Sequence, residues 1–227
     1  MKVIGFSAPL THTADEIITI AAVSYTSKDK VCIAAVNDKG EWFRLVNPFQ
    51  RAGGNRFWRL NDIREPNVMN HIIPGDVFQI WGKQAEEEIR GIKRQREDYI
   101  PLECSRFGFV RDLHSQLLPA CISMGDFSKY MNSQKDSLFA IKINRLQWVR
   151  KYEDGIVRYF GYLDDVNLRN VYYRHPEDGS YQITDLTFFE QTEHRGYESS
   201  GYCPNSIVVF GLSRIGKPLI VSIIKER

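Results

Sequence analysis

Short apolar segments separated by turn signals recur along the whole chain, and this rhythm most constrains its fold. Glycine and asparagine adopt the backbone angles that tight turns need, while β-branched and aromatic residues favour strands. Many short strands with turns between them are typical of a β-barrel or a β-sandwich. We therefore expect a mainly β protein. The turn signals are Asn37-Asp38-Lys39-Gly40, Pro74-Gly75-Asp76, Asp154-Gly155, Asp178-Gly179 and Ile215-Gly216-Lys217.

The clearest hairpin lies in residues 146–162, which read LQWVRKYEDGIVRYFGY. Asp154 and Gly155 tolerate a positive φ, and the arms on either side are rich in aromatic and β-branched residues. This segment therefore predicts two antiparallel strands joined by a tight turn.

Helical periodicity is confined to residues 106–131, where Phe109, Leu113 and Leu117 recur at a four-residue spacing. A chain of 227 residues fits one large all-β domain or two domains of about 100 residues each. No internal repeat at a fixed period is visible. We expect the helical segment to separate two β units. The first unit, with an N-terminal arm, would span residues 1–100, the helical connector 101–136 and the second unit 137–227.

The composition disfavours several classes of protein. The formal net charge is only +2, so attraction to a polyanion must come from local patches. The longest apolar runs are too short to cross a bilayer, and the N-terminus lacks the apolar centre of a signal peptide. We therefore expect a cytoplasmic protein with no membrane partner. The cysteines are too far apart for a zinc knuckle and the histidines lack metal-binding spacing, so we expect no metal and no cofactor.

A first cluster of arginines and aromatics begins at Trp42 and Arg44. Side chains alternate along a strand, so these two share one face while Phe43 and Leu45 share the other, which is expected to be core. Arginine binds phosphate in a fork and aromatic rings accept any base, so the cluster suits nucleic acid. A solvated loop whose aromatics cap a barrel end is an equally consistent interpretation. The candidate binding residues here are Trp42, Arg44, Arg51, Arg56, Trp58 and Arg59.

A second cluster lies on the predicted hairpin. Alternation places Trp148, Arg150 and Tyr152 on one face of the first arm, and it places Arg158, Phe160 and Tyr162 on one face of the second. Burying unpaired guanidinium groups costs several kcal/mol each, so we expect faces that are exposed or paired with a ligand or with acids. The alternative is cation–π stacking within the protein. The candidate binding residues are Trp148, Arg150, Tyr152, Arg158 and Phe160.

Catalytic motifs are weak. The chain has no Walker loop, no dinucleotide fingerprint and no nucleophile with an adjacent base and orienting group. Neighbouring carboxylates such as Asp164 and Asp165 point to opposite faces of a strand, so they do not form an acid/base couple. The sequence therefore favours a binding protein over an enzyme, with no catalytic residue assigned.

Four segments together resemble the prokaryotic dual OB-domain family: GEWFRLVNP (residues 40–48), PGDVFQI (74–80), YQITDLTFFE (181–190) and VVFGLSRIGKPLIVSII (208–224). The resemblance implies two tandem OB-like small β-barrels that bind nucleic acid rather than catalyse a known reaction. It also draws attention to Trp42, Arg44, Thr184 and Asp185. Independently, OB barrels bind single strands across an open sheet face, with aromatics for bases and basic loops for phosphates.

Three functions are consistent with these features. We favour a binder of single-stranded or structured DNA or RNA, held across β-barrel faces by the arginine and aromatic clusters. A second possibility is a reader of a small anionic ligand or a modified nucleotide in a pocket between the barrels. The third is a non-catalytic adaptor whose aromatic faces bind a protein partner encoded by a neighbouring gene.

Overall fold

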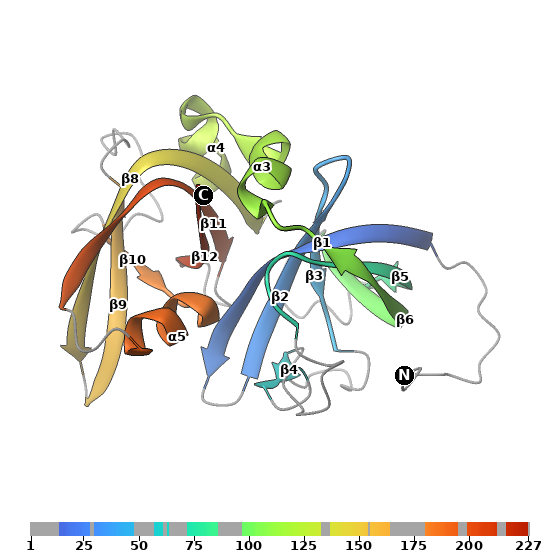
Figure 1. Cartoon of the computed structure of the whole chain (residues 1–227), viewed down its shortest axis with the longest axis horizontal. Coiled ribbons are helices and arrows are strands. Elements are labelled where there is room, and N and C mark those ends of the chain that lie inside the picture. Colours follow the sequence, from blue (N-terminus) through green and yellow to red (C-terminus); the bar gives the residue numbers. More distant parts are fainter. Residues whose placement is uncertain are drawn as a thin grey trace. The chain divides into compact units, whose positions relative to one another are not determined.

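The structure is a computed structural model of the chain (Figure 1). The chain divides into two compact units, Met1–Leu113 and His114–Arg227, and each is described by itself. The residues that the structure describes are 14–27, 30–47, 57–60, 63, 72–85, 97–132, 137–153, 155–163, 180–194, 199–212 and 217–226.

The first unit is built on a sheet whose strands close into a ring. Antiparallel pairs join β1 to β2, β2 to β3, β6 to β5 and β5 to β1, and the one parallel pair joins β3 to β6. The short strand β4 adds to the outside of this ring by pairing with β2. The strands are β1 (Ala14–Ser27), β2 (Lys30–Asn37), β3 (Trp42–Leu45), β4 (Trp58–Arg59), β5 (Asp76–Gln84) and β6 (Asp98–Phe109).

The turn between β2 and β3 follows from its residues. The Asn37 side-chain oxygen accepts hydrogen bonds from the N–H groups of Lys39 and Glu41, at 3.0 and 2.9 Å. Gly40 has a φ of 78°, a conformation that side chains rarely adopt. The turn predicted at residues 37–40 is therefore confirmed, and the turn predicted at residues 74–76 is also present, with Gly75 at a φ of 99°.

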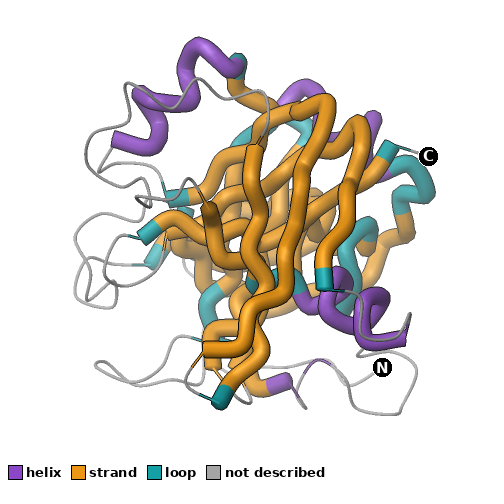
Figure 2. Tube along the Cα trace, turned by 90° about the vertical axis from the view of Figure 1, so that its left-hand side faces the viewer, coloured by secondary structure: helices purple, strands orange, loops and turns teal. Residues whose placement is uncertain are grey.

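The second unit closes a ring with the same pattern. Figure 2 shows the strands of the chain in a view turned by 90° from that of Figure 1. Antiparallel pairs join β8 to β9, β9 to β10, β12 to β11 and β11 to β8, and one parallel pair joins β10 to β12. The strand β7 adds to this ring by pairing with β8 in parallel. The strands are β7 (Cys121–Ile122), β8 (Leu138–Glu153), β9 (Ile156–Leu163), β10 (Ser180–Ile183), β11 (Ser200–Leu212) and β12 (Pro218–Lys225).

Aromatic rings fill the second barrel near both of its ends. At one end Phe127, the first residue of α4, packs 5.5 Å from Phe210, measured between ring centroids. At the other end Phe188 of α5 packs 5.4 Å from Trp148. Figure 1 shows α4 and α5 at opposite ends of this barrel. The helices are α3 (Leu113–Leu117), α4 (Phe127–Asn132) and α5 (Leu186–His194), and the 3-10 turns are η1 (Leu118–Ala120) and η2 (Met124–Asp126).

The predicted fold class is confirmed, since the protein is mainly β with a closed five-strand barrel. The predicted hairpin is also confirmed, because β8 and β9 pair from Leu146↔Leu163 to Glu153↔Ile156. The turn predicted at residues 178–179 lies outside the described residues, as do residues 215 and 216 of the turn predicted at residues 215–217.

Two expectations differ from the structure. The helical periodicity assigned to residues 106–131 is wrong in part, because β6 continues to Phe109 and the helical residues are interrupted by β7. Pairing with β5 decides this region, since tertiary contacts override a weak local preference. The sequence also missed α5, whose nine residues begin after Thr184 and Asp185, which follow the end of β10.

Candidate functional site

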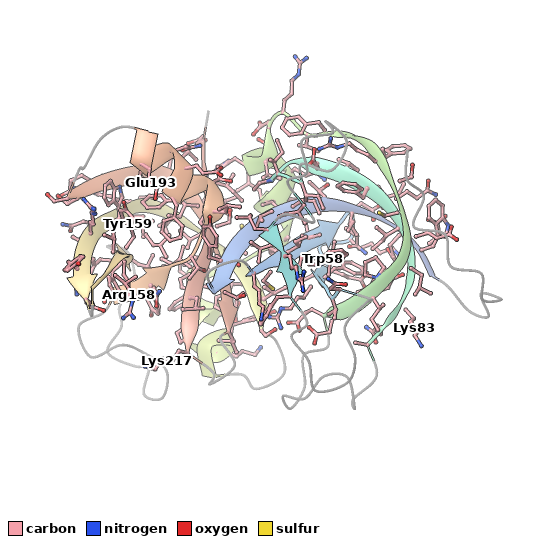
Figure 3. The ribbon with its side chains drawn as sticks, turned by 90° about the horizontal axis from the view of Figure 1, so that it is seen from below. Trp58, Lys83, Arg158, Tyr159, Glu193 and Lys217 are labelled. Carbon is pink, nitrogen blue, oxygen red and sulfur yellow. The ribbon has the colours of Figure 1, made fainter. Side chains whose placement is uncertain are left out.

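The β8–β9 hairpin sorts the second arginine and aromatic cluster onto two opposite faces. Trp148 pairs with Gly161 and Arg150 pairs with Tyr159, so these residues share one face. Trp148 and Tyr159 are only 5% and 6% exposed, which makes this the inner face of the barrel. Arg158 projects outward, whereas Tyr159 points inward (Figure 3). Strand alternation places Phe160 and Tyr162 on the same face as Arg158.

Trp148 belongs to the core of the second barrel. Its indole ring packs 5.4 Å from Phe188 and 5.9 Å from Tyr159. Gly161 and Gly201 lie opposite it on the two neighbouring strands, and a Cβ on Gly201 would come within 2.7 Å of the indole. The prediction that Trp148 lies on an exposed face is therefore wrong. The indole occupies the space that Gly201 leaves on the inner side of the barrel.

The outer face carries cations and aromatic rings across three neighbouring strands. The register places Tyr162 and Tyr202 on either side of Gln147. The Lys151 ammonium lies 4.7 Å from the centroid of the Phe160 ring, and the Arg145 guanidinium lies 3.7 Å from that of Tyr202. We call this set the outer patch. It comprises Arg145, Lys151, Arg158, Phe160, Tyr162 and Tyr202.

Arg158 forms an ion pair with an acidic residue at the surface. Its Nη1 lies 2.9 Å from Oε2 of Glu153, and the two side chains are 33% and 39% exposed. Ion pairs this exposed stabilise a fold by only about 0–1 kcal/mol. A phosphate can therefore compete with Glu153 for Arg158 at little cost in free energy.

Thr184 and Asp185 anchor α5 rather than lining a surface. Both are buried, and the N–H of Thr184 donates to the carbonyl of Ile220 in β12 at 2.8 Å. The Asp185 carboxylate accepts hydrogen bonds from three backbone N–H groups. These are those of Thr187 at 2.9 Å, Phe188 at 3.2 Å and Ile223 at 2.8 Å. Asp185 thus caps the start of α5 and ties the helix to β12.

Burial controls the ionisation of Asp185. The loss of hydration raises the pKa of its carboxyl group to about 6, although the three N–H donors and Lys225 act in the opposite direction. The carboxyl group therefore titrates in mildly acidic solution.

Arg44 of the first barrel lies in a buried ion pair. Leu45 pairs with Tyr99, and the Tyr99 ring lies 5.5 Å from the Phe43 ring, so these residues mark the inner face. Arg44 and Asp98 lie on the outer face, where Nη1 and Oδ1 are 3.3 Å apart and the side chains are 11% and 0% exposed. The core face predicted for Leu45 is confirmed. The prediction that Arg44 lies on an open surface is wrong, because the buried carboxylate of Asp98 neutralises the Arg44 guanidinium.

The remaining residues of the first cluster lie in different settings. Trp42 is half-buried on the same face of β3 as Arg44. Trp58 in β4 donates its indole N–H to the carbonyl of Leu45 at 2.8 Å, and the ring is half-buried (Figure 3). Arg59 is exposed, while Arg51 and Arg56 lie outside the described residues. Nucleic-acid binding by this cluster stays a prediction.

In the second cluster, Arg150 is half-buried on the inner face near Tyr159, and Tyr152 is 75% exposed. The sequence interpretation missed Arg145 and Tyr202 as parts of one surface. Only the β8–β11 register brings them together, because Arg145 and Tyr202 are more than fifty positions apart in the chain.

Three other kinds of feature bear on function, namely a metal site, a reactive thiol and a membrane-spanning helix. Among the residues that the structure describes, no group of three histidine, cysteine or acidic side chains is placed to hold a metal ion. Burial raises the pKa of the Cys32, Cys104 and Cys121 thiols, to about 11 for Cys121, so these thiols stay protonated at neutral pH. Within the same described ranges, no helix has the length and apolar character needed to cross a bilayer.

Comparison with known proteins assigns no family to the chain. No protein-family model matches the sequence, and no curated protein matches it.

Proposed function

We propose that the chain binds nucleic acid and that the outer patch of the second barrel is the contact surface. One observation carries the proposal. The patch pairs a cation with an aromatic ring twice, as Lys151 with Phe160 and Arg145 with Tyr202, on one continuous sheet face. Cations suit phosphates and flat rings suit bases, so both requirements of a nucleic-acid strand are met within the patch, where each cation lies over its ring.

The topology supports this proposal. Leaving out β4 and β7, the strands of each ring follow the order first, second, third, fifth, fourth and back to first, with the third and fifth parallel. This is the strand order of the OB fold, so we infer that the chain contains two OB-like barrels. The inference agrees with the resemblance to the prokaryotic dual OB-domain family.

The patch overlaps at one strand, β9, with the surface that OB barrels use for binding. They hold oligonucleotides across the face of their second and third strands. In the second barrel these strands are β9 and β10, and β9 contributes Arg158, Phe160 and Tyr162 to the patch. From Arg145 to Lys151 the patch extends about 20 Å along β8, at roughly 3.3 Å per residue. That length accommodates several nucleotides.

Fluorescence anisotropy with labelled single-stranded DNA and RNA at two salt concentrations tests the proposal. We expect affinity to fall steeply with salt because phosphate contacts release counterions. Phe160→Ala removes one stacking surface and should weaken binding by about 1–3 kcal/mol. Phe107→Ala is the matched control, because Phe107 is an exposed ring, 68% accessible, on β6 of the first barrel. If the wild-type protein binds no DNA or RNA, or if both variants lose affinity equally, the outer patch is not the site.

A further inference from the structure

The β8–β9 hairpin extends past the barrel as a two-stranded arm. The pairing of β8 with β11 ends at Val149↔Ser200, and the pairing of β9 with β10 ends at Tyr159↔Ile183. Beyond these points the described residues of β8 and β9 are paired with each other alone, in three pairs. The arm is therefore about 10 Å long, at roughly 3.3 Å per residue. Its pairs are Lys151↔Arg158, Tyr152↔Val157 and Glu153↔Ile156.

The end of the arm carries apolar side chains that the barrel does not cover. Tyr152 is 75% exposed, Ile156 is 56% exposed and Val157 is 36% exposed. Tyr152 and Val157 share one face, and Ile156 lies on the other. A two-stranded ribbon has no core of its own, so exposed apolar groups gathered at its end indicate a surface that contacts something else.

The base of the arm identifies the chemistry of its partner. Lys151 and Arg158 stand opposite each other where the arm leaves the barrel, and both also belong to the outer patch. A strand lying on the patch and continuing past these two cations reaches Ile156, beside Glu153, on the same face of the arm. Tyr152 and Val157 lie just behind them on the opposite face. This continuity favours nucleic acid as the occupant over a separate protein.

Resting on the proposed function, we infer that the arm packs its apolar end against the terminal base pair of a duplex while the adjoining single strand lies on the outer patch. The substrate class is then a junction between duplex and single strand. Apolar side chains that insert at base steps contact exposed base faces in this way. Tyr152 supplies the largest flat surface, Val157 widens it on the same face, and Ile156 adds an apolar contact on the opposite face of the arm, where the outer patch lies.

Binding of three labelled DNAs tests the inference: a single strand, a blunt duplex and the same duplex carrying that single strand as a tail. The wild-type chain should bind the tailed duplex at least about fivefold more tightly than the single strand alone, as one added stacking contact provides. The double variant Tyr152→Ala/Ile156→Ser should lose this preference and keep its affinity for the single strand. These side chains are exposed, so the variant should fold. Phe107→Ala should leave all three affinities unchanged.

A fluorescent 2-aminopurine at the junction gives a second measurement, because stacking on Tyr152 should quench it in the wild type and not in the double variant. If the wild type binds the single strand and the tailed duplex equally, the inference is wrong while the proposed function stands. A preference that persists in the double variant also overturns it, since the arm is then not its source. If no nucleic acid binds at all, the proposed function itself fails.

Discussion

The two barrels have the same pattern of strand pairings, but different interactions stabilise the pair of parallel strands in each barrel. In the first barrel, β3 and β6 are joined by the buried ion pair between Arg44 and Asp98, with the Phe43 and Tyr99 rings inside. In the second, β10 and β12 share the pair Ile183↔Ile220, and α5 begins three residues after Ile183. Asp185 ties that helix to β12 by accepting the N–H of Ile223. One topology is thus stabilised by a charge pair in one barrel and by a helix cap in the other.

The outer faces differ in a way that bears on function. On the outer side of β2 and β3 in the first barrel, Ala34, Val36 and Arg44 are 3%, 2% and 9% exposed. The matching strand β9 of the second barrel presents half-buried Arg158, Phe160 and Tyr162. A buried, internally neutralised arginine is poorly placed to bind phosphate, so we propose the second barrel as the contact surface. Arginine therefore takes part in a buried ion pair in the first barrel, whereas in the second barrel arginine and aromatic residues form the proposed contact surface.

The largest expected effect tests the charge pair of the first barrel. Asp98→Ala leaves the Arg44 guanidinium buried without its carboxylate, which should lower the free energy of unfolding by about 3–5 kcal/mol. Urea unfolding followed by circular dichroism measures this loss. Glu153→Ala, which removes the exposed partner of Arg158, is the matched control and should cost about 0–1 kcal/mol. Replacing both buried partners, as Arg44→Met with Asp98→Leu, should restore much of the loss. Equal small losses for Asp98→Ala and Glu153→Ala would remove the contrast between the two pairs.

An intermediate effect tests the packing of the second barrel. Gly201→Ala places a Cβ within 2.7 Å of the Trp148 indole, and overpacking of this kind should cost about 1–3 kcal/mol of unfolding free energy. Gly108→Ala on β6 is the control, because no heavy atom lies within 4 Å of its added Cβ. In a Trp148→Ala background the cost of Gly201→Ala should disappear, since the two changes act on one contact. If Gly201→Ala still lowers the free energy of unfolding in the Trp148→Ala background, the strain does not come from contact with the Trp148 indole.

The third effect is a dependence on pH and concerns the helix cap of the second barrel. The pKa of Asp185 is raised to about 6, above its ordinary value of 3.8, so the folded state holds this proton more tightly than the unfolded state. The group's contribution to stability is complete below the ordinary pKa and is lost as the pH rises to about 6. The slope should not exceed about 1.4 kcal/mol per pH unit for one proton. Urea unfolding of wild type and Asp185→Asn at several pH values isolates it. A wild-type stability that instead rises with pH, relative to the variant, would mean that the N–H donors outweigh burial.

Local features of the sequence predicted the strands and some of the turns. The hairpin at residues 146–162 and the turn at residues 37–40 depend on glycine, asparagine and alternating apolar residues, all of which act over a few positions. The sequence did not predict α5, because its cap Asp185 lies inside a segment whose apolar residues also suit a strand. The sequence also did not reveal that the same ring of strands occurs twice, because the two barrels share strand pairings rather than a regular spacing of sequence motifs.

Alternation also settled which residues share a face, but not which face is inside. Trp148, Arg150 and Tyr152 do share one face, as do Arg158, Phe160 and Tyr162, yet the two sets point in opposite directions from the sheet. Whether a guanidinium such as Arg44 meets solvent or a buried carboxylate depends on a partner fifty-four residues away in the chain. The sequence by itself determined the strands and their periodicity, because these depend on neighbouring residues. Only the tertiary structure decided inside from outside, because burial and charge pairing arise from long-range strand registers that no local pattern specifies.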